Sequence, residues 1–273
     1  MSVSFSTDEY KQFQVFLENA CGIVLGDNKQ YLVSSRLGRF MKDRGIDTLK
    51  DLVVKLNRSK NSELNTKVIE AMTTHETLWF RDTYPFQILS DNIFDGYKKQ
   101  KKDSLRVWSS ACSSGQEPYS ISMIADEYLK KYPSFKVDIT ATDISKEILN
   151  TAKQAQYDSL ALARGLSEER KQQYFSPMGN SWQVNAKIRN RITFREINLL
   201  QSYVPLGKFD VIFCRNVLIY FSLDAKKDII DRMANLLNPS GYLFLGSSEA
   251  ISQYTDRFEM IRTSLGVVYQ IKP

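Results

Sequence analysis

The chain has few of the residues that build metal sites and disulfide frameworks. It contains three cysteines and one histidine among 273 residues. Cys21, Cys112 and Cys214 are odd in number and far apart, so the sequence predicts neither a disulfide framework nor a CxxC metal site. Unpaired cysteines are typical of a reducing compartment. We therefore expect a cytoplasmic protein that needs no metal ion.

Long apolar runs and targeting signals are also missing. No apolar run approaches the ~18 residues that a membrane span requires. The first residues, MSVSFSTDEYK, include acidic side chains and lack the basic-then-apolar pattern of a secretory signal. We therefore expect no direct membrane insertion.

Composition is that of an ordinary globular protein. Hydrophobic residues make up 42% and charged residues 25%, and the length suits one large domain or two moderate ones. The formal net charge of +6 permits an acidic partner, either nucleic acid or protein. Charge alone does not choose between them.

Two common nucleotide-binding motifs, GxGxxG and GxxxxGK[ST], are absent. One stretch nevertheless has the layout of a cofactor site: LRVWSSACSSGQEPYS, from Leu105 to Ser120, predicts a strand, a loop of small residues and a helix with Pro118 at its first position. A loop with one glycine and the carboxylate of Glu117 suits a ligand with an ammonium group and hydroxyls better than one with phosphates. Taken alone, such a loop is more often an ordinary strand–helix turn.

Residues 1–90 read as a helical domain and residues 91–273 as a second domain. Apolar residues at helical spacing predict helices over 8–20, 29–44, 48–56, 62–72 and 85–99. From Leu105 the pattern changes to alternating strands and helices, which predicts an α/β fold with a mostly parallel sheet covered on both faces. The expected strands are 105–108, 137–142, 192–194, 209–213 and 242–245, with an antiparallel pair at 258–261 and 267–271 and helices at 144–155 and 223–237.

One segment interrupts this alternation. Between Gln172 and Arg191 a cluster of turn residues is flanked by short alternating runs. We expect a small antiparallel β subdomain inserted near residues 174–194.

Polar residues follow three of the expected strands. The small-residue loop before Glu117 follows the first, Asp143 ends the second, and Arg215 and Asn216 end the strand over 209–213, with Tyr220 shortly afterwards. The carboxyl ends of parallel strands share one edge of a sheet, where a carboxylate after the second strand typically holds ribose hydroxyls. Together these loops predict a nucleoside-binding site.

The sequence resembles the chemotaxis receptor methyltransferases, the CheR family. The resemblance rests on YLVSSRLGRFMKDRGI, TTHETLWFRD, WSSACSSGQEPYS, ATDIS, ITFREINLL, FDVIFCRNVLIYF and LFLGSSEAI, in family order over nearly the whole chain. It implies a Rossmann-like methyltransferase domain that uses S-adenosylmethionine and releases S-adenosylhomocysteine. It also implies that the acceptors are glutamate side chains on the cytoplasmic helical domains of chemoreceptors, and that the product is a glutamyl methyl ester.

The resemblance also implies roles for individual residues. At position 75 this chain has histidine where we expect the family's asparagine. The residues at family cofactor positions are His75, Thr77, Arg81, Glu117, Asp143, Asn198, Leu199, Arg215 and Asn216.

Two side chains, Arg81 and Tyr220, are the candidates for orienting the acceptor carboxylate. A glutamate is already ionised at neutral pH, since its unperturbed pKa is about 4.3, so the reaction needs no general base. Alternatives are open: Arg81 pairs with a nearby carboxylate, or Tyr220 is a packed aromatic residue. The helix over 29–44 offers Arg36, Arg39 and Lys42 to a glutamate-rich substrate, although basic residues on a helix are often only a solvated face.

Two rival functions fit parts of the sequence. A nucleic-acid methyltransferase would suit the basic charge, but Asn216-Val217-Leu218-Ile219 lacks the two prolines that base amino methylation typically uses. A cofactor sensor without activity would keep the fold, but the polar residues of the site are all present. We therefore expect an enzyme that does not bind nucleic acid and acts as a monomer.

Overall fold

The computed structural model describes residues 5–58 and 63–273. It divides into two compact units. The first, the helical unit, reaches to Thr74 and also contains Ile219–Lys226; the second, the sheet unit, contains His75–Leu218 and Lys227–Pro273. Residues 75–90, grouped with the helices in the sequence-based division at residue 90, lie in the sheet unit.

The described residues in the first segment of the helical unit form four helices, as the apolar spacing predicts: α1 (Thr7–Cys21), α2 (Gln30–Lys42), α3 (Leu49–Arg58) and α4 (Glu63–Met72). Ser62, where the fourth was expected to start, lies outside the described residues. Helix α1 begins at a capping box, because Ser6 Oγ accepts from Glu9 N while Glu9 Oε2 accepts from Ser6 N. Gly22 ends it in the left-handed conformation.

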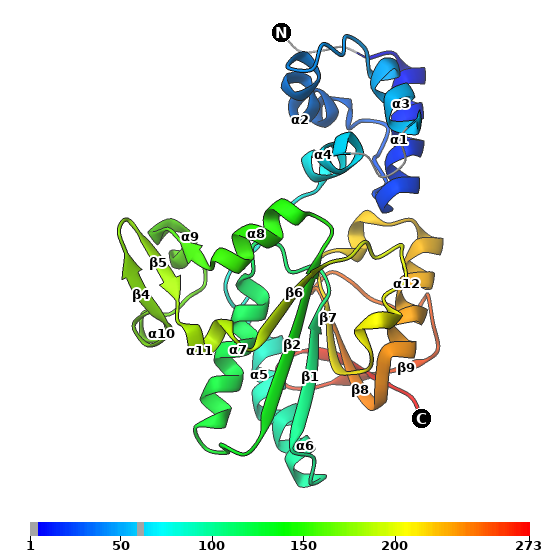
Figure 1. Cartoon of the computed structure of the whole chain (residues 1–273). Helices are drawn as coiled ribbons and strands as arrows, with labels where there is room; N and C mark the ends of the chain where they lie inside the picture. The colour runs from blue at the N-terminus through cyan, green and yellow to red at the C-terminus, as the bar shows by residue number, and fades with distance from the viewer. Residues whose placement is uncertain (1–4, 59–62) are drawn as a thin grey trace. The chain divides into compact units, whose positions relative to one another are not determined.

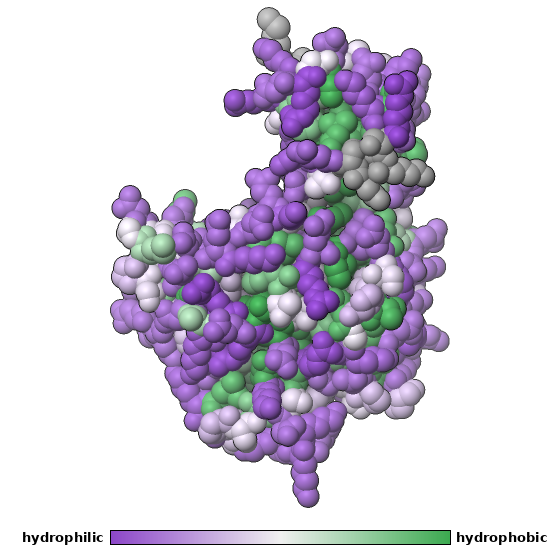
Figure 2. Space-filling model, viewed as in Figure 1, coloured by the Kyte–Doolittle hydropathy of each residue, from purple (hydrophilic) through white to green (hydrophobic). Residues whose placement is uncertain are grey.

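The core of the helical unit comes from the apolar stripe of each helix. Phe13, Leu17, Val33, Leu37 and Leu52 are fully buried. Polar side chains cover much of its visible face, and apolar ones gather between the helices (Figure 2). None of the helices in residues 5–58 and 63–273 is long and apolar enough to cross a bilayer.

The sheet unit is built on seven strands in the order β6-β2-β1-β7-β8-β10-β9 (Figure 1). Their bounds are β1 (Ser104–Ser109), β2 (Lys136–Asp143), β6 (Ile192–Glu196), β7 (Phe209–Cys214), β8 (Leu237–Leu245), β9 (Phe258–Arg262) and β10 (Val267–Ile271). The five from β6 to β8 run parallel, and β10 pairs antiparallel with both β8 and β9. The mostly parallel α/β fold is therefore confirmed, and the chain reverses direction across the sheet between β1 and β7.

The first half of the sheet is connected through helices α7 (Gln116–Leu129) and α8 (Lys146–Gln154), and α12 (Leu223–Leu236) precedes β8. Alternate residues of β1 face opposite layers. Val107 joins the core that includes α7 and residues 86–97. Trp108 packs on the other face against Tyr203, at 5.0 Å between ring centroids, and Tyr203 Oη in turn donates to Ile229 O of α12.

Most element boundaries differ from the sequence prediction by a residue or two, and three of the differences have a clear structural basis. Helix α7 begins at Gln116 rather than at Pro118, because Gly115 at φ 98° forms its N-cap. Helix α8 begins two residues later than expected, since Ser145 caps it by accepting from Ile148 N. Strand β8 begins at Leu237, so Asn238 and Pro239 lie within a strand that carries a register shift against β7 instead of simply closing a helix.

The expected helix over 85–99 forms as one continuous run with a change of pitch. It comprises α5 (Tyr84–Ile88), a π-helical segment η1 (Leu89–Phe94) and α6 (Asp95–Lys99). Phe86, Leu89 and Phe94 are buried in the large core of the sheet unit.

The inserted β subdomain has three antiparallel strands in the order β3-β5-β4. Strands β4 (Phe175–Met178) and β5 (Ser181–Val184) lie where the sequence predicts them, whereas β3 (Gln156–Tyr157) comes from before the predicted segment. Short helices α9 (Ser159–Ala163), α10 (Glu168–Tyr174) and α11 (Ala186–Arg189) accompany them.

Trp79 joins this small sheet to the loop over residues 75–83. Its ring is fully buried and meets Tyr157 and Phe175 edge-on, at centroid distances of 4.9 and 5.3 Å. Trp79 N also donates to Arg164 O at 3.0 Å, which brings Gly165 against the same backbone. The aromatic residue between the polar positions of the TTHETLWFRD motif is thus a packing residue.

Gly165→Ala should destabilise the protein more than Gly179→Ala. Both glycines have positive φ, but a Cβ at 165 would lie 2.2 Å from Trp79 O, while a Cβ at 179 meets nothing within 4 Å. The left-handed conformation alone costs an L-residue about 1–2 kcal/mol, so the control variant should lose roughly that and Gly165→Ala clearly more. Urea unfolding of both variants measures this, and equal losses would contradict the close approach.

Candidate active site

The candidate site lies at the carboxyl edge of the parallel strands, where the sheet order reverses between β1 and β7. The loop over residues 110–115 follows β1, Asp143 ends β2, and Arg215 with Asn216 follow β7. Ser110 N and Oγ both donate to Phe213 O, which fastens the end of β1 to the end of β7. The sequence-predicted edge residues of the sheet unit therefore do gather at one edge.

Arg215 is the centre of the site's charge network. Its side chain is only 2% exposed and donates through Nη1 to Glu117 Oε2 at 3.0 Å and through Nη2 to Asp82 Oδ2 at 2.7 Å. Nη2 also donates to Arg81 O at 2.8 Å. Ser109 Oγ completes the cluster by donating to the other oxygen of Glu117 at 2.7 Å. One buried guanidinium thus joins β7, the start of α7 and the 75–83 loop.

One donor of this guanidinium has no partner among the described residues. Arg215 Nε is buried and makes no hydrogen bond within them. Burying an unpaired donor is costly, so the nitrogen suits an acceptor group that a ligand would supply. Glu117 beside it is an acceptor for a cationic group. The pair matches a zwitterion, with a carboxylate near Arg215 and an ammonium near Glu117.

Asp143 is held by backbone amides. Oδ2 accepts from Ser113 N at 2.8 Å and Oδ1 from Ser145 N at 3.1 Å. Burial raises the pKa of this carboxyl above its usual value, while the two amides and the nearby His75 act in the opposite direction. A ligand hydroxyl that donates to Asp143 would favour its charged form.

The 75–83 loop carries three of the sequence-predicted residues. Ser113 Oγ donates to His75 O at 2.9 Å, so the backbone of His75 lies against the 110–115 loop. Thr77 is half-buried in the same loop. Arg81 is half-buried, and its Nη1 donates to Glu76 O at 3.3 Å. The ion pair of Glu76 is with Arg164, and that of Asp82 is with Arg215, so neither carboxylate forms one with Arg81.

Asn198 and Leu199 follow β6 in a tight turn. Asn198 Oδ1 accepts from Leu200 N at 3.0 Å, and Leu199 is buried. Arg232 of α12 supports the turn by donating to Leu199 O at 2.7 Å. The pair presents one polar and one apolar side chain, a combination that suits an adenine ring.

Glu249 is a site residue that the sequence reasoning missed. Its Oε2 accepts from Asn216 N at 2.7 Å and from Gly246 N at 2.8 Å, which fastens the end of β7 to the end of β8. Asn216 stands at φ 56° in this arrangement. The signal was present, because a carboxylate three residues after Gly246 sits inside the LFLGSSEAI motif.

Several non-glycine residues around the site have left-handed backbone conformations. They are Phe80, Asp82, Thr83, Ser113 and Asn216, with φ between 49° and 65°. Each costs free energy that the surrounding contacts must offset, and such residues cluster at functional sites. Their concentration in the 75–83 loop and at the ends of β1 and β7 supports the assignment of this edge.

Tyr220 belongs to the helical unit. It ends the short turn Leu218–Tyr220, and its carbonyl accepts from Val24 N at 2.8 Å. Its side chain is half-buried.

The three cations of α2 have different surroundings. Arg36 donates to Met72 O and Thr73 O at 2.7 and 2.9 Å and to Thr74 Oγ1 at 3.1 Å, so it holds the chain at the end of α4. Arg39 is 93% exposed, with Asp43 at 3.7 Å, and Lys42 is exposed. Arg39 and Lys42 therefore have exposed side chains, whereas Arg36 is half-buried and hydrogen-bonded at the end of α4.

Two family models match the chain: "CheR methyltransferase, all-alpha domain" over residues 8–73 and "CheR methyltransferase, SAM binding domain" over residues 75–267. The chain belongs to the CheR methyltransferase family. The resemblance read from the motifs is thereby confirmed, and the sheet unit is the family's S-adenosylmethionine-binding domain. The residues of the edge fit that group, because Glu117, Asp143 and the unpaired Arg215 Nε offer partners for its ammonium, hydroxyl and carboxylate groups.

Curated CheR relatives match along almost the whole chain. "Chemotaxis protein methyltransferase Cher2" of Pseudomonas putida KT2440 is 52% identical over 97% of this chain and 98% of the relative. "Chemotaxis protein methyltransferase 1" of Pseudomonas aeruginosa PAO1 is 50% identical over 99% of this chain and 100% of the relative. "Chemotaxis protein methyltransferase" of Vibrio parahaemolyticus is 46% identical over 99% of each.

Asp143→Asn should change the pH dependence of stability. Because burial raises the folded-state pKa of Asp143, the carboxyl contributes most below its unfolded pKa of about 3.9, and the contribution is lost as pH rises through the folded value. The stability difference, wild type minus Asp143→Asn, should therefore decline from pH 3 to pH 7. Urea unfolding without cofactor across this range measures it. A difference that stays constant or grows with pH would contradict the raised pKa.

Proposed function

We propose that this CheR-family chain transfers a methyl group from S-adenosylmethionine to glutamate side chains on the cytoplasmic helical domains of chemoreceptors. The products are glutamyl methyl esters and S-adenosylhomocysteine. The observation that carries the proposal is the edge of the sheet unit, where Arg215, Glu117 and Asp143 offer a buried donor and two acceptors in the family's cofactor-binding domain. The names of the curated relatives point to the same chemotaxis role.

In this proposal the cofactor is held by groups that are already in place. Asp143 takes the ribose hydroxyls, Glu117 the ammonium and Arg215 the carboxylate, while Asn198 and Leu199 flank the adenine. His75 and Thr77 line the site from the 75–83 loop, and Asn216 from the end of β7. When bound, S-adenosylmethionine supplies a methyl group on a positively charged sulfur, which a carboxylate can accept without proton transfer.

The protein's own contribution is then positioning. The acceptor glutamate is ionised at neutral pH, so the site needs a group that aligns its carboxylate without removing its charge. Arg81 suits this task because it forms no ion pair with the adjacent Glu76 or Asp82, whose partners are Arg164 and Arg215. Tyr220 is the second candidate, because its hydroxyl can donate a hydrogen bond to a carboxylate.

The receptor segment itself would be recognised by charge. Glutamate-rich helices are attracted to cations on a rigid face, and α2 presents Arg39 and Lys42. Arg36 was the third predicted contact, and its guanidinium is used at the end of α4, so we assign it the role of supporting the face.

Labelled S-adenosylmethionine and receptor cytoplasmic fragments test the proposed function. Wild type should place base-labile label on receptor glutamates, identified by mass spectrometry. Arg81→Ala should turn over about 100-fold more slowly per folded molecule at saturating S-adenosylmethionine, since misaligned reactants lose that order of rate. Arg262→Ala, which removes an exposed arginine on β9, is the matched control.

Three results would contradict this proposal. Label on duplex or single-stranded nucleic acid would favour the nucleic-acid methyltransferase, and cofactor binding without any transfer would favour the sensor. Normal turnover per folded molecule in Arg81→Ala would remove Arg81 from the reaction.

Charge reversal on α2 should weaken receptor recognition alone. Arg39→Glu with Lys42→Glu should raise KM for the receptor fragment about tenfold at low salt, while the affinity for S-adenosylhomocysteine stays constant. Lys11→Glu with Lys55→Glu, two exposed lysines of α1 and α3, makes the same charge change in the same unit. Added salt should reduce the difference in KM for the receptor fragment between wild type and the α2 variant. Equal increases in KM for both double variants would show that net charge alone causes the effect, and would contradict recognition by α2.

A further inference from the structure

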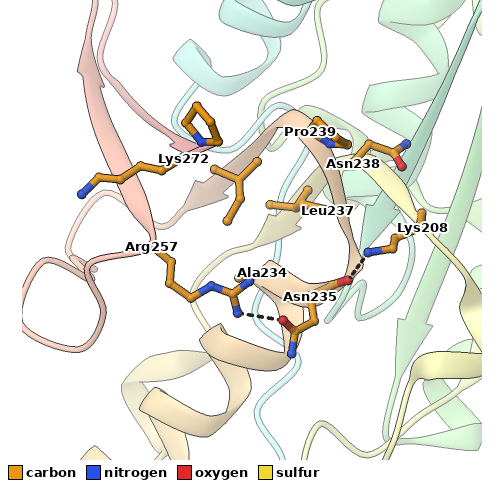
Figure 3. Close-up of a pocket in the computed structure, with 10 residues that line it drawn as sticks. Lys208, Ala234, Asn235, Leu237, Asn238, Pro239, Arg257 and Lys272 are labelled. Carbon is orange, nitrogen blue, oxygen red and sulfur yellow. Dashed lines mark hydrogen bonds between the residues drawn. The ribbon is translucent and has the colours of Figure 1, made fainter.

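A cavity opens at the opposite edge of the sheet unit from the candidate active site, where β7 and β8 begin and β10 ends (Figure 3). It has a volume of about 280 Å³. No carboxylate side chain lines it. The lining residues are Lys208, Ala234, Asn235, Leu237, Asn238, Pro239, Arg257, Ile271, Lys272 and Pro273.

The lining combines an apolar floor with a cationic rim. Ala234 and Leu237 are buried, and Ile271 beside them is half-buried. Lys208, Arg257 and Lys272 provide three positive charges. None of the three belongs to an ion pair with a carboxylate within residues 5–58 and 63–273.

Two of the cations are fixed by the end of α12. Lys208 Nζ donates to Asn235 O at 2.5 Å, and Arg257 Nη1 donates to Asp231 O at 3.0 Å and to Asn235 Oδ1 at 2.8 Å. Figure 3 shows both side chains meeting at Asn235, whereas Lys272 extends outward from the rim. The helix end carries only about half a negative charge, which offsets only part of the charge of the three lining cations.

The fixed cations still have donors to offer. An ammonium has three N–H groups and a guanidinium has five. The hydrogen bonds to the end of α12 use one N–H group of Lys208 and the Nη1 group of Arg257. Nε and Nη2 of Arg257 therefore remain as donors. The side-chain amide of Asn238 has two N–H groups, of which one donates to the buried Asp210 and the other remains. Because these groups are held before any ligand arrives, little side-chain entropy is lost on binding.

The chemistry of the cavity defines its ligand. An anion with several acceptor oxygens and a double charge matches the two anchored cations and the exposed Lys272, and a phosphate group has both properties. The floor requires an apolar body next to that group. The volume lies just below the usual range for ligand pockets, about 300–1,000 Å³, so the body is small.

We propose that this cavity is a binding site for a small phosphate monoester, with the phosphate at Lys208 and Arg257, the exposed charge of Lys272 attracting it from the rim, and the apolar part on Leu237 and Ile271. The site is separate from the edge that holds the methyltransferase residues, and it does not depend on the proposed function.

Phenyl phosphate is a suitable probe, titrated into the full chain and followed by NMR chemical-shift changes. Saturating S-adenosylhomocysteine blocks the cofactor site during the titration. Phenyl phosphate should bind saturably. Inorganic phosphate has only the anionic group and phenol only the apolar ring, so the affinity of each should be lower by about tenfold or more.

Variants locate the binding. Lys272→Glu, at a residue whose side chain extends from the rim, should lower the affinity for phenyl phosphate severalfold. Arg257→Gln should lower it about tenfold or more. Lys153→Glu, at an exposed residue of α8, makes the same charge change as Lys272→Glu and should leave the affinity unaltered.

The proposal is overturned by absence of saturable binding up to about 20 mM of the probe, a concentration of the order of weak fragment affinities. Equal binding of phenol, or the same affinity in wild type and Lys272→Glu, would also overturn it. Because Lys272→Glu removes no contact of the fold, its result stands even if Arg257→Gln unfolds.

Discussion

The desolvated guanidinium of Arg215 is the interaction on which the rest of the site depends. A buried cation is tolerated only when opposite charges surround it, and Glu117 and Asp82 meet that need from two different segments. Charge balance therefore dictates where the start of α7 and the 75–83 loop lie relative to β7. The loop is further fixed by Ser113 at one end and by the packing of Trp79 on the inserted sheet. Electrostatic and aromatic contacts together hold a loop whose backbone includes several left-handed residues.

The fold was predictable because it rests on local signals. Strand and helix alternation indicated the parallel sheet, and polar residues after successive strands located the edge where Asp143 and Arg215 meet. What could not be predicted depends on contacts between distant segments. Tyr157, whose hydroxyl donates to Ser114 O, lies in a strand of two residues without any periodic pattern. The hydrogen bonds of Arg36 at the end of α4 could not be predicted either, because the sequence pattern of a helix-face arginine is the same whether its side chain is solvated or hydrogen-bonded.

In the candidate site, too, some residues were predictable from the sequence and others were not. Residue types and order led to Glu117, Asp143 and Arg215, since charged side chains directly after parallel strands converge on one edge of the sheet. Glu249 lies inside the LFLGSSEAI motif, which was the available signal, but its role was missed because the two backbone amides that donate to it cannot be read from a sequence. Boundaries moved for a similar reason: Gly115 and Ser145 begin helices through cap geometry, and Asn238 and Pro239 lie within a strand despite their preference for turns.

The helical unit is discontinuous in the chain, because Ile219–Lys226 belongs to it although Thr74 is the last residue of its first segment. The amide of Val24 takes its partner from Tyr220, almost two hundred residues later in the chain. A ribosome that has finished the four helices has therefore not finished the unit. Domains that emerge first usually fold first, whereas here the hydrogen bond of Val24 N can form only after Tyr220 has been synthesised. The contacts of the helical unit are therefore complete only after residues 75–218 of the sheet unit have been made.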